Sequence, residues 1–239
     1  MFYPLPKSEI VDREQYLVSL CAKKDVIHLG AAQANDGNDL GVYGTTIDPT
    51  TFLHSKISAV ATRCIGIDYN RNSIELLRSR YGIENIRFAN IEDKESLACV
   101  QFVPDVVVMG EIIEHLPNPG FALSNVRNAL MSDKSVLVVT MPNALDSNNF
   151  LYGLLRREAH DPDHVAFYSP RLFERLCEKV GLRVIDVRYY QVTKSPSGRN
   201  YYQMDRFIPR KLFLFFYYNF VLRLNPGFSN GLIITAKKA

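Results

Sequence analysis

The chain has 239 residues, of which 47% are hydrophobic and 22% are charged, values typical of a soluble globular protein with one sizeable core. Its formal net charge of +3 is too small to indicate a nucleic-acid partner by itself, and the sequence contains no tract of like charges. The N-terminal segment has no long apolar core, and no stretch reaches the roughly 20 apolar residues of a membrane-spanning helix. We therefore expect a single cytoplasmic domain over residues 1–239.

The four cysteines, Cys21, Cys64, Cys99 and Cys177, are far apart in the sequence and form no C-x-x-C pair. Their number and spacing indicate reduced thiols of a cytosolic protein rather than disulfides. The sequence contains no zinc-type spacing either.

The first half of the chain alternates helices with short apolar strands. The periodicity predicts helices over 8–24, 52–62 and 72–81 and strands over 26–30, 64–68 and 85–89. A polar, glycine-bearing stretch, 33–51, separates the first strand from the second helix. Loops of this length are uncommon in compact domains and tend to be functional.

The second half begins with the strongest strand, 105–110, an unbroken apolar run of the kind found in parallel strands covered on both faces. The pattern then predicts helices over 119–131 and 169–180 and strands over 135–141, 182–192 and 231–237. A basic, aromatic insertion, 206–230, separates the last two strands and suggests an antiparallel addition at the sheet edge. The predicted fold class is α/β: a Rossmann-like, doubly wound, mostly parallel seven-stranded sheet with an antiparallel edge strand and a C-terminal aromatic helical insertion.

Small and acidic residues follow the first two strands, where ligands of an open parallel sheet bind. Gly30, Ala31 and Ala32 follow the first strand and let a ligand approach the backbone. Asp68 closes the second strand, where it can accept hydrogen bonds from ribose hydroxyls or instead cap the helix that begins near Asn72. The order and spacing of these features predict a nucleoside-type site across the two strands.

Six segments carry a family resemblance: DVIHLGAA, RCIGIDYN, IRFANIED, DVVVMGEIIEHLPNP, SVLVVTMPN and HVAFYSPRLFERLCEKVGLRV. Through them the chain resembles the class I S-adenosylmethionine-dependent methyltransferases. The most specific segments, EIIEHLPNP and HVAFYSP, are similar to those of small-molecule methyltransferases, including quinone-type and sugar-type enzymes. The segment TTFLHSKISAVATRCIGID more narrowly resembles members encoded with surface-polysaccharide genes.

The resemblance implies a set of residues that bind S-adenosylmethionine. In this family the loop after the first strand lies near the methionine part of the cofactor, and the acid after the second strand binds the ribose. The residue after that acid and those after the third strand face the adenine, and those after the fourth strand close the floor under the sulfonium. The matching positions here are Gly30, Ala31, Ala32, Asp68, Tyr69, Asn90, Ile91, Gly110 and Glu111.

The sequence departs from the family pattern at a few of these positions. His28 stands where the family usually has an acid that organises the loop and the methionine amino group. Ala31 and Ala32 replace residues of a Gly-x-Gly pattern, and Asn90 replaces an aspartate that faces the adenine amine. Alanine still permits close approach, and the asparagine oxygen can still accept from that amine, so we expect cofactor binding to be retained.

Two histidines are candidate general bases, because methyl transfer often requires removal of a proton from the acceptor. His164 precedes the FYSP helix start and is the first candidate; His115, after the fourth strand, is the second. Each also has a structural interpretation, in which the imidazole only holds a neighbouring backbone or carboxyl group. His160 and His164 flank two aspartates, but no third ligand is evident, so no metal site is predicted.

The segment 206–224, RFIPRKLFLFFYYNFVLRL, is apolar on nearly every side of a helix and has basic residues at both ends. Its apolar run, 212–222, is about half of a membrane span and so does not cross a bilayer. One interpretation is packing on its own domain or on the second subunit of a homodimer. The other is an interfacial helix at the inner face of the membrane, which would fit a lipid-linked sugar or quinone acceptor.

These features together predict an O-methyltransferase that acts on a sugar or glycan hydroxyl. A quinone-type or other small-molecule acceptor is the alternative among enzymes. A catalytically silent fold that binds a partner enzyme is the alternative of a different class, and cofactor binding separates it from both enzymes. No nucleic-acid partner is expected, because no N-P-P-Y-type signature follows the fourth strand and no basic stripe is present.

Overall fold

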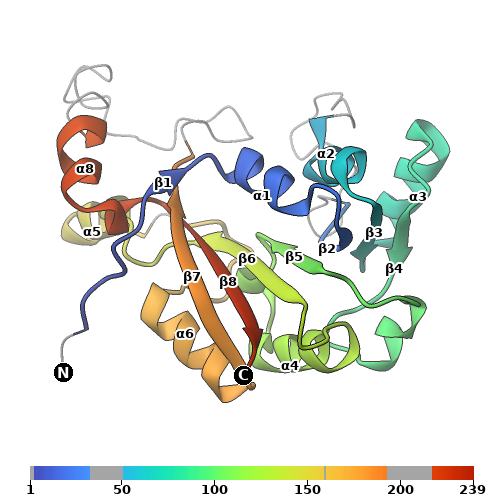
Figure 1. Ribbon diagram of the computed structural model, residues 1–239. Helices are drawn as coiled ribbons and strands as arrows, with labels where there is room; N and C mark the ends of the chain where they lie inside the picture. Colours follow the sequence, from blue (N-terminus) through green and yellow to red (C-terminus); the bar gives the residue numbers. More distant parts are fainter. Residues whose placement is uncertain (1–2, 33–50, 159, 193–216) are drawn as a thin grey trace.

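The computed structural model describes residues 3–32, 51–158, 160–192 and 217–239 (Figure 1). The strands are β1 (Ile10–Val11), β2 (Asp25–Leu29), β3 (Arg63–Asp68), β4 (Ile86–Phe88), β5 (Val106–Gly110), β6 (Val136–Pro142), β7 (Leu182–Tyr190) and β8 (Gly231–Lys238). The α-helices are α1 (Arg13–Cys21), α2 (Leu53–Val60), α3 (Arg71–Tyr81), α4 (Pro119–Ala129), α5 (Ser147–Leu154), α6 (Pro170–Lys179) and α8 (Leu222–Leu224). Short 3₁₀ turns are η2 (Glu95–Cys99), η3 (Ile113–His115) and η6 (Pro226–Phe228), and a π-helical turn, η5 (Tyr217–Val221), precedes α8.

In the described part of the chain, the strands form one eight-stranded sheet in the order β1-β7-β8-β6-β5-β2-β3-β4. Every neighbouring pair is parallel except the two pairs that involve β8. The predicted mostly parallel, Rossmann-like sheet with an antiparallel addition is therefore confirmed. Two details differ from the sequence prediction: β8 lies between β6 and β7, and an eighth strand, β1, occupies the outermost position on that side.

The central strand β2 is where the order of the sheet reverses. β2 pairs with β3 on one side and with β5 on the other, so the chain builds the sheet outward in two opposite directions from this point. In open α/β sheets the carboxyl ends of the strands that flank such a switch point form the ligand site. We therefore expect the ligand site at the segments that follow β2, β3 and β5.

Helices cover both faces of the sheet, as Figure 1 shows for α1 and α2 on one side and α4 and α6 on the other. The alternation of side chains along β5 explains why its sequence is apolar throughout. Val106 and Val108 join the core formed with α1 and α2, whereas Val107 and Met109 join the core formed with α4 and α6. All four side chains are at most 2% exposed.

The N-terminal segment differs from the prediction of one helix over 8–24. Ile10 and Val11 form β1 instead, paired with Tyr189 and Tyr190 of β7. The helix begins later because the Asp12 side chain accepts a hydrogen bond from Gln15 N at 2.8 Å and caps α1. Helix α5, which no sequence signal indicated, is a second addition.

The aromatic insertion lies mostly outside the described residues. Only its last part is described, as the π-helical turn η5, the short helix α8 and the turn η6. The membrane-surface and dimer interpretations of 206–224 therefore stay predictions. Among the described residues, no helix is both long and apolar enough to span a bilayer.

Candidate functional site

The turn after β2 is tied directly to the end of β3. The backbone N–H groups of Gly30 and Ala31 donate to the carbonyl of Ile67 at 2.9 and 3.2 Å. Ala32 N then donates to Oδ2 of Asp68 at 2.9 Å. The loop and the acid that the sequence predicted as one nucleoside site are thus joined by hydrogen bonds.

Glycine is required at the first position of this turn. Gly30 has a φ of +73°, in the left-handed region that other residues rarely adopt. A Cβ there would also lie 2.5 Å from Cγ2 of Ile112, closer than atoms can approach. Ala31 and Ala32, by contrast, are fully buried and pack against Ile74, so their methyl groups fill a small core. Their departure from the glycine pattern is accommodated by packing.

The Asp68 carboxylate is buried, with 7% of the residue exposed. Oδ2 accepts from Ala32 N, and Oδ1 accepts from Asn70 N at 2.9 Å. Because a carboxylate offers about four lone pairs, it can accept from ribose hydroxyls in addition to these two donors. The alternative in which Asp68 caps α3 does not hold, since the cap is the side chain of Asn70, which accepts from Ser73 N at 3.0 Å.

The predicted adenine-side residues fall into two environments. Tyr69 is 56% exposed directly after β3, and Asn90 is exposed after β4. The Oδ1 atom of Asn90 already accepts from Glu92 N at 2.9 Å, which fixes the turn. Ile91 is only 7% exposed and packs into the core on the α4 side of the sheet.

His28 of β2 and His54 of α2 form a buried pair. Each is 1% exposed, and their rings stack with centroids 5.5 Å apart. Burial lowers the pKa of both imidazoles, and for His28 the neighbouring His54 and Arg13 lower it further. The acid of the family pattern is thus replaced here by a neutral ring. His28 Nδ1 and His54 Nε2 have no hydrogen-bond partner among the described residues.

Glu111 follows β5 with a φ of +52°, a strained conformation for a residue with a side chain. Its backbone N–H donates to the carbonyl of Thr140 at 3.0 Å. Its Oε1 accepts from the Tyr190 hydroxyl at 2.8 Å and forms an ion pair with the Arg13 guanidinium at 3.2 Å. Sequence reasoning missed Arg13 and Tyr190, because they come from α1 and β7, far from Glu111 in the chain.

Glu114, His115 and His164 gather beyond the end of β5. The two imidazole centroids lie 4.7 Å apart in an edge-to-face arrangement. Glu114 is 1% exposed, and burial, reinforced by the nearby Glu111 carboxylate, raises its pKa to about 9. The two predicted base candidates therefore meet in space, whereas His160 is exposed and lies against Phe167.

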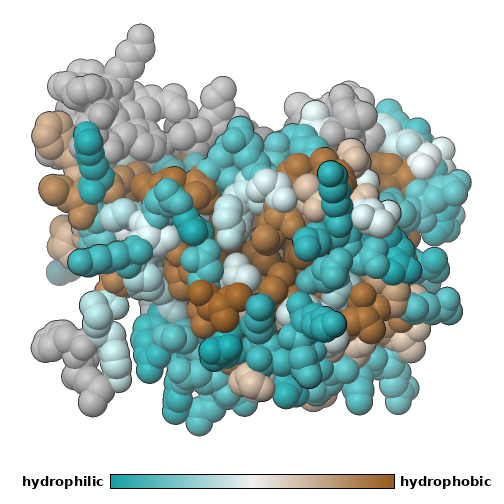
Figure 2. Space-filling model, in the orientation of Figure 1, coloured by the Kyte–Doolittle hydropathy of each residue, from teal (hydrophilic) through white to brown (hydrophobic). Residues whose placement is uncertain are grey.

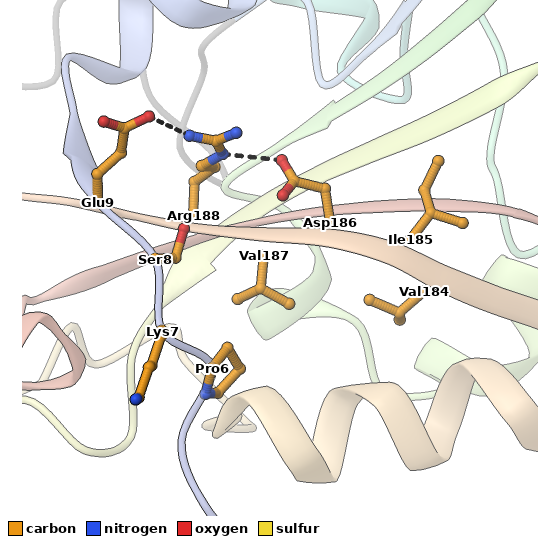
Figure 3. A pocket seen from close by; sticks show the side chains of 9 residues that line it. All are labelled: Pro6, Lys7, Ser8, Glu9, Val184, Ile185, Asp186, Val187 and Arg188. Carbon is orange, nitrogen blue, oxygen red and sulfur yellow. Dashed lines mark hydrogen bonds and ion pairs between the residues drawn. The ribbon is translucent and has the colours of Figure 1, made fainter.

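A surface cavity of about 530 Å³ lies elsewhere, between the N-terminal segment 6–9 and residues 184–188 of β7 (Figure 3). Arg188 crosses it and contacts Glu9 and Asp186, the latter at 2.9 Å. The cavity contains none of the predicted cofactor or base residues. It reflects the docking of the N-terminal segment on the sheet edge.

Comparisons with known proteins identify the family of the chain. A family model described as a methyltransferase domain matches residues 41–187, more than half of the chain. A curated protein of Mycolicibacterium smegmatis, named a probable S-adenosylmethionine-dependent methyltransferase, is 28% identical over 172 residues, which are 72% of this chain. The match spans 57% of that relative's length.

Solved structures share the fold. A methyltransferase from Archaeoglobus fulgidus aligns with a TM-score of 0.53 and 18% identity, over 95% of each chain. A magnesium protoporphyrin IX methyltransferase from Synechocystis, solved with bound S-adenosylhomocysteine, aligns with a TM-score of 0.54 and 7% identity, over 95% of this chain and 83% of its own. With the family match, the chain belongs to the class I S-adenosylmethionine-dependent methyltransferases.

Proposed function

We propose that residues 1–239 form one methyltransferase domain that methylates a hydroxyl of a sugar or glycan. The observation that carries the cofactor half of this proposal is the hydrogen bond from Ala32 N to Asp68 Oδ2. It holds the turn after β2 against the acid after β3, which is the arrangement that a nucleoside with an attached amino acid requires. The bound cofactor supplies an electrophilic methyl group on a sulfonium.

The proposed cofactor contacts follow the strand ends in order. Asp68 binds the ribose hydroxyls, Tyr69 and Asn90 border the adenine, and the Gly30 turn adjoins the methionine part. Gly110 and Glu111 lie at the end of β5, next to the turn. Ile91 supports the adenine side of the site from within the core, because its side chain is buried.

The acceptor side is assigned to the cluster after β5. His164, assisted by His115, orients the acceptor hydroxyl and accepts its proton as the new oxygen–carbon bond forms. The polar groups around the cluster, which include Glu111, Tyr190 and Arg13, favour an acceptor with several hydroxyl groups.

A quinone-type acceptor is the second candidate, and exposed apolar side chains on α5 favour it. Phe150, Leu154 and the adjoining Leu155 are 68%, 66% and 63% exposed. Helix α5 follows β6, so it lies at the same edge of the sheet as the acceptor cluster, and Figure 2 shows apolar surface on the side of α5 and α8. An acceptor that joins a sugar to an apolar carrier could contact both the polar cluster after β5 and the apolar side chains of α5.

The cofactor half is tested by calorimetric titration with S-adenosylmethionine and S-adenosylhomocysteine. We expect micromolar binding by the full chain. Asp68→Asn removes the negative charge that the ribose hydroxyls contact and should weaken binding by on the order of 10- to 100-fold. Asp25→Asn is the matched control, because Asp25 lies at the opposite end of β2. Absence of binding at millimolar cofactor would favour the catalytically silent fold.

The acceptor half is tested by supplying the protein with cofactor and a panel of pyranosides, nucleotide sugars and quinols. We expect a sugar that gains one methyl group by mass spectrometry, with release of S-adenosylhomocysteine. His164→Ala should lower turnover by roughly 100-fold or more, as loss of a general base does, without changing cofactor affinity. Methylation of the quinols alone would replace the sugar proposal with its rival.

A further inference from the structure

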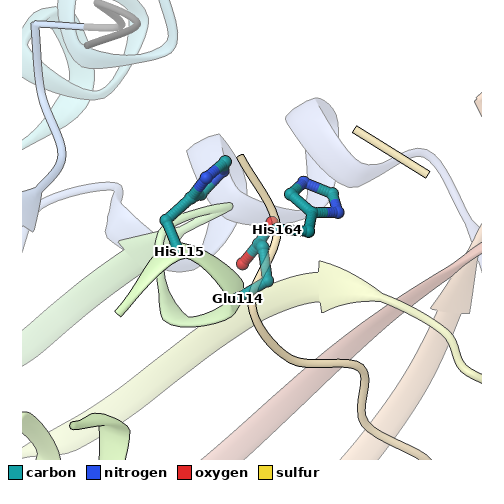
Figure 4. Close-up of side chains that lie close together, drawn as sticks. All are labelled: Glu114, His115 and His164. Carbon is teal, nitrogen blue, oxygen red and sulfur yellow. The ribbon is translucent and has the colours of Figure 1, made fainter. Parts of the chain in front are cut away.

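The acceptor cluster also has the composition of a metal site. Glu114, His115 and His164 each offer one ligand atom, and these atoms all lie within 4.8 Å of one another. Figure 4 shows the Glu114 carboxylate close to both imidazole rings. Sequence reasoning considered His160 and His164 and found no third ligand; the fold brings two other ligands from the segment after β5.

Two polar atoms of this cluster lack a partner among the described residues. They are Oε2 of Glu114, in a residue that is 1% exposed, and Nδ1 of His164. A buried polar atom without a hydrogen bond is costly, so such atoms usually bind an ion or an ordered water. A cation at this position would satisfy both atoms at once.

The backbone holds the three side chains in place. Turn η3 carries Glu114 and His115, and the carbonyl of Glu114 accepts from Val165 N and Ala166 N at 2.9 and 3.2 Å. These bonds fasten the His164 segment to the turn. Nδ1 of His115 lies 3.2 Å from the carbonyl of Asp163, and donation to it leaves Nε2 available as a ligand. Metal-binding histidines commonly make this second contact.

The surrounding charges also favour a cation. The carboxylates of Glu111 and Asp161 act on this position, and among the described residues the guanidinium of Arg13 opposes them. Ligand atoms around one tetrahedral zinc lie roughly 3.4 Å apart, because each bond is about 2.1 Å long. The three ligand atoms here lie within 4.8 Å of one another, so a bound zinc would draw them closer together.

We propose that Glu114, His115 and His164 bind one divalent transition-metal cation at the acceptor side of the site. Two imidazoles and one carboxylate suit zinc and its first-row neighbours and leave a coordination position open. A hydroxyl bound there would release its proton to water more readily, so the metal would activate the acceptor and His164 would serve as a ligand and not as the base. This use of the metal rests on the proposed function, whereas the binding site itself does not.

The test is calorimetric titration of the chelator-treated full chain with zinc chloride, supported by visible absorption with cobalt chloride. We expect one site with micromolar or tighter affinity. Glu114→Gln and His164→Ala should each weaken binding by at least ~10-fold. His160→Ala is the matched control, because His160 is an exposed histidine of the same loop outside the cluster, and it should leave affinity unchanged.

Thermal melting of each variant checks that it is folded. If Glu114→Gln or His164→Ala is not folded, His115→Ala is tested in its place, since His115 is exposed. No binding at millimolar zinc, or equal losses in His160→Ala and His164→Ala, would overturn the site. A cofactor titration of the same samples reports separately on the proposed function. If the site binds zinc but chelator leaves turnover unchanged, the activating role is overturned.

Discussion

Glu111 shows how one strained residue links distant parts of the chain. A non-glycine residue in the left-handed region costs of order 1–3 kcal/mol, and such strain tends to persist at functional sites where the surroundings fix it. Here the Thr140 carbonyl holds its backbone, and Arg13 and Tyr190 hold its carboxylate. Burial, with the Glu111 carboxylate, raises the pKa of Tyr190 well above its ordinary value, so the phenol stays protonated and donates.

The cysteines provide a prediction at the same scale. Burial raises the pKa of Cys21 and Cys177 to about 12 and also raises that of Cys64. Because the thiolate is the reactive form, a pKa of about 12 lowers its fraction at pH 8 by on the order of a thousandfold relative to an ordinary thiol. Alkylation with iodoacetamide, followed by peptide mass spectrometry, should therefore label the less buried Cys99 first.

In concentrated guanidinium chloride all four cysteines should react alike, which is the control for this experiment. Reactivity of the three buried thiols should rise with pH, because the thiolate fraction grows as pH approaches their pKa. Rapid labelling of Cys177 in the native protein at pH 8 would contradict its burial against the sheet.

Strand β8 carries more of the fold than its place at the end of the sequence suggests. It fills the gap between β6 and β7 and hydrogen-bonds to both, whereas β1 pairs only with β7. Its side chains Ile233 and Ile234 are fully buried on opposite faces of the sheet, one in each main core. Shortening either side chain should leave a cavity in its core that the packed elements around it cannot fill.

Ile234→Ala should accordingly lower the free energy of unfolding by roughly 2–5 kcal/mol, measured by urea denaturation. Ile10→Ala, in the edge strand β1, is the matched control, and it should cost less than about 1 kcal/mol because Ile10 is 37% exposed. Equal losses in the two variants would mean that β8 is not the central element that its pairing indicates.

At the scale of the whole molecule, stability should fall from the middle of the sheet to its edges. β5 and β2 are paired on both sides and buried on both faces, whereas β1 and β4 are short edge strands. Local opening free energies range from near zero at frayed edges to the global value in the core.

Hydrogen–deuterium exchange should therefore be slower in β5 than in β1 and β4 by at least ~100-fold. Addition of S-adenosylmethionine should slow exchange further at residues 30–32 and 68–70, where the turn after β2 meets β3. Protection confined to other segments would indicate that the cofactor binds elsewhere.

The sequence anticipated much of the fold because its signals are local. The apolar run of β5, the glycine after β2 and the proline that begins α4 each act through neighbours in the chain. The same locality explains two differences. The helix predicted over 8–24 became β1 and α1 because pairing with β7, a distant contact, outweighed the helical periodicity. Helix α5 gave no clear local signal.

By itself the sequence determined the class of fold, the order along the chain of the strands from β2 to β8, the methyltransferase family and the loop–acid pair around Gly30 and Asp68. The tertiary structure decided what depends on contacts across the chain. It placed Arg13 and Tyr190 on Glu111, stacked His28 on His54, and brought His164 to Glu114 and His115. The reason is physical: periodicity and turn chemistry act over a few residues, whereas the meeting of side chains from separate strand ends depends on the packed sheet.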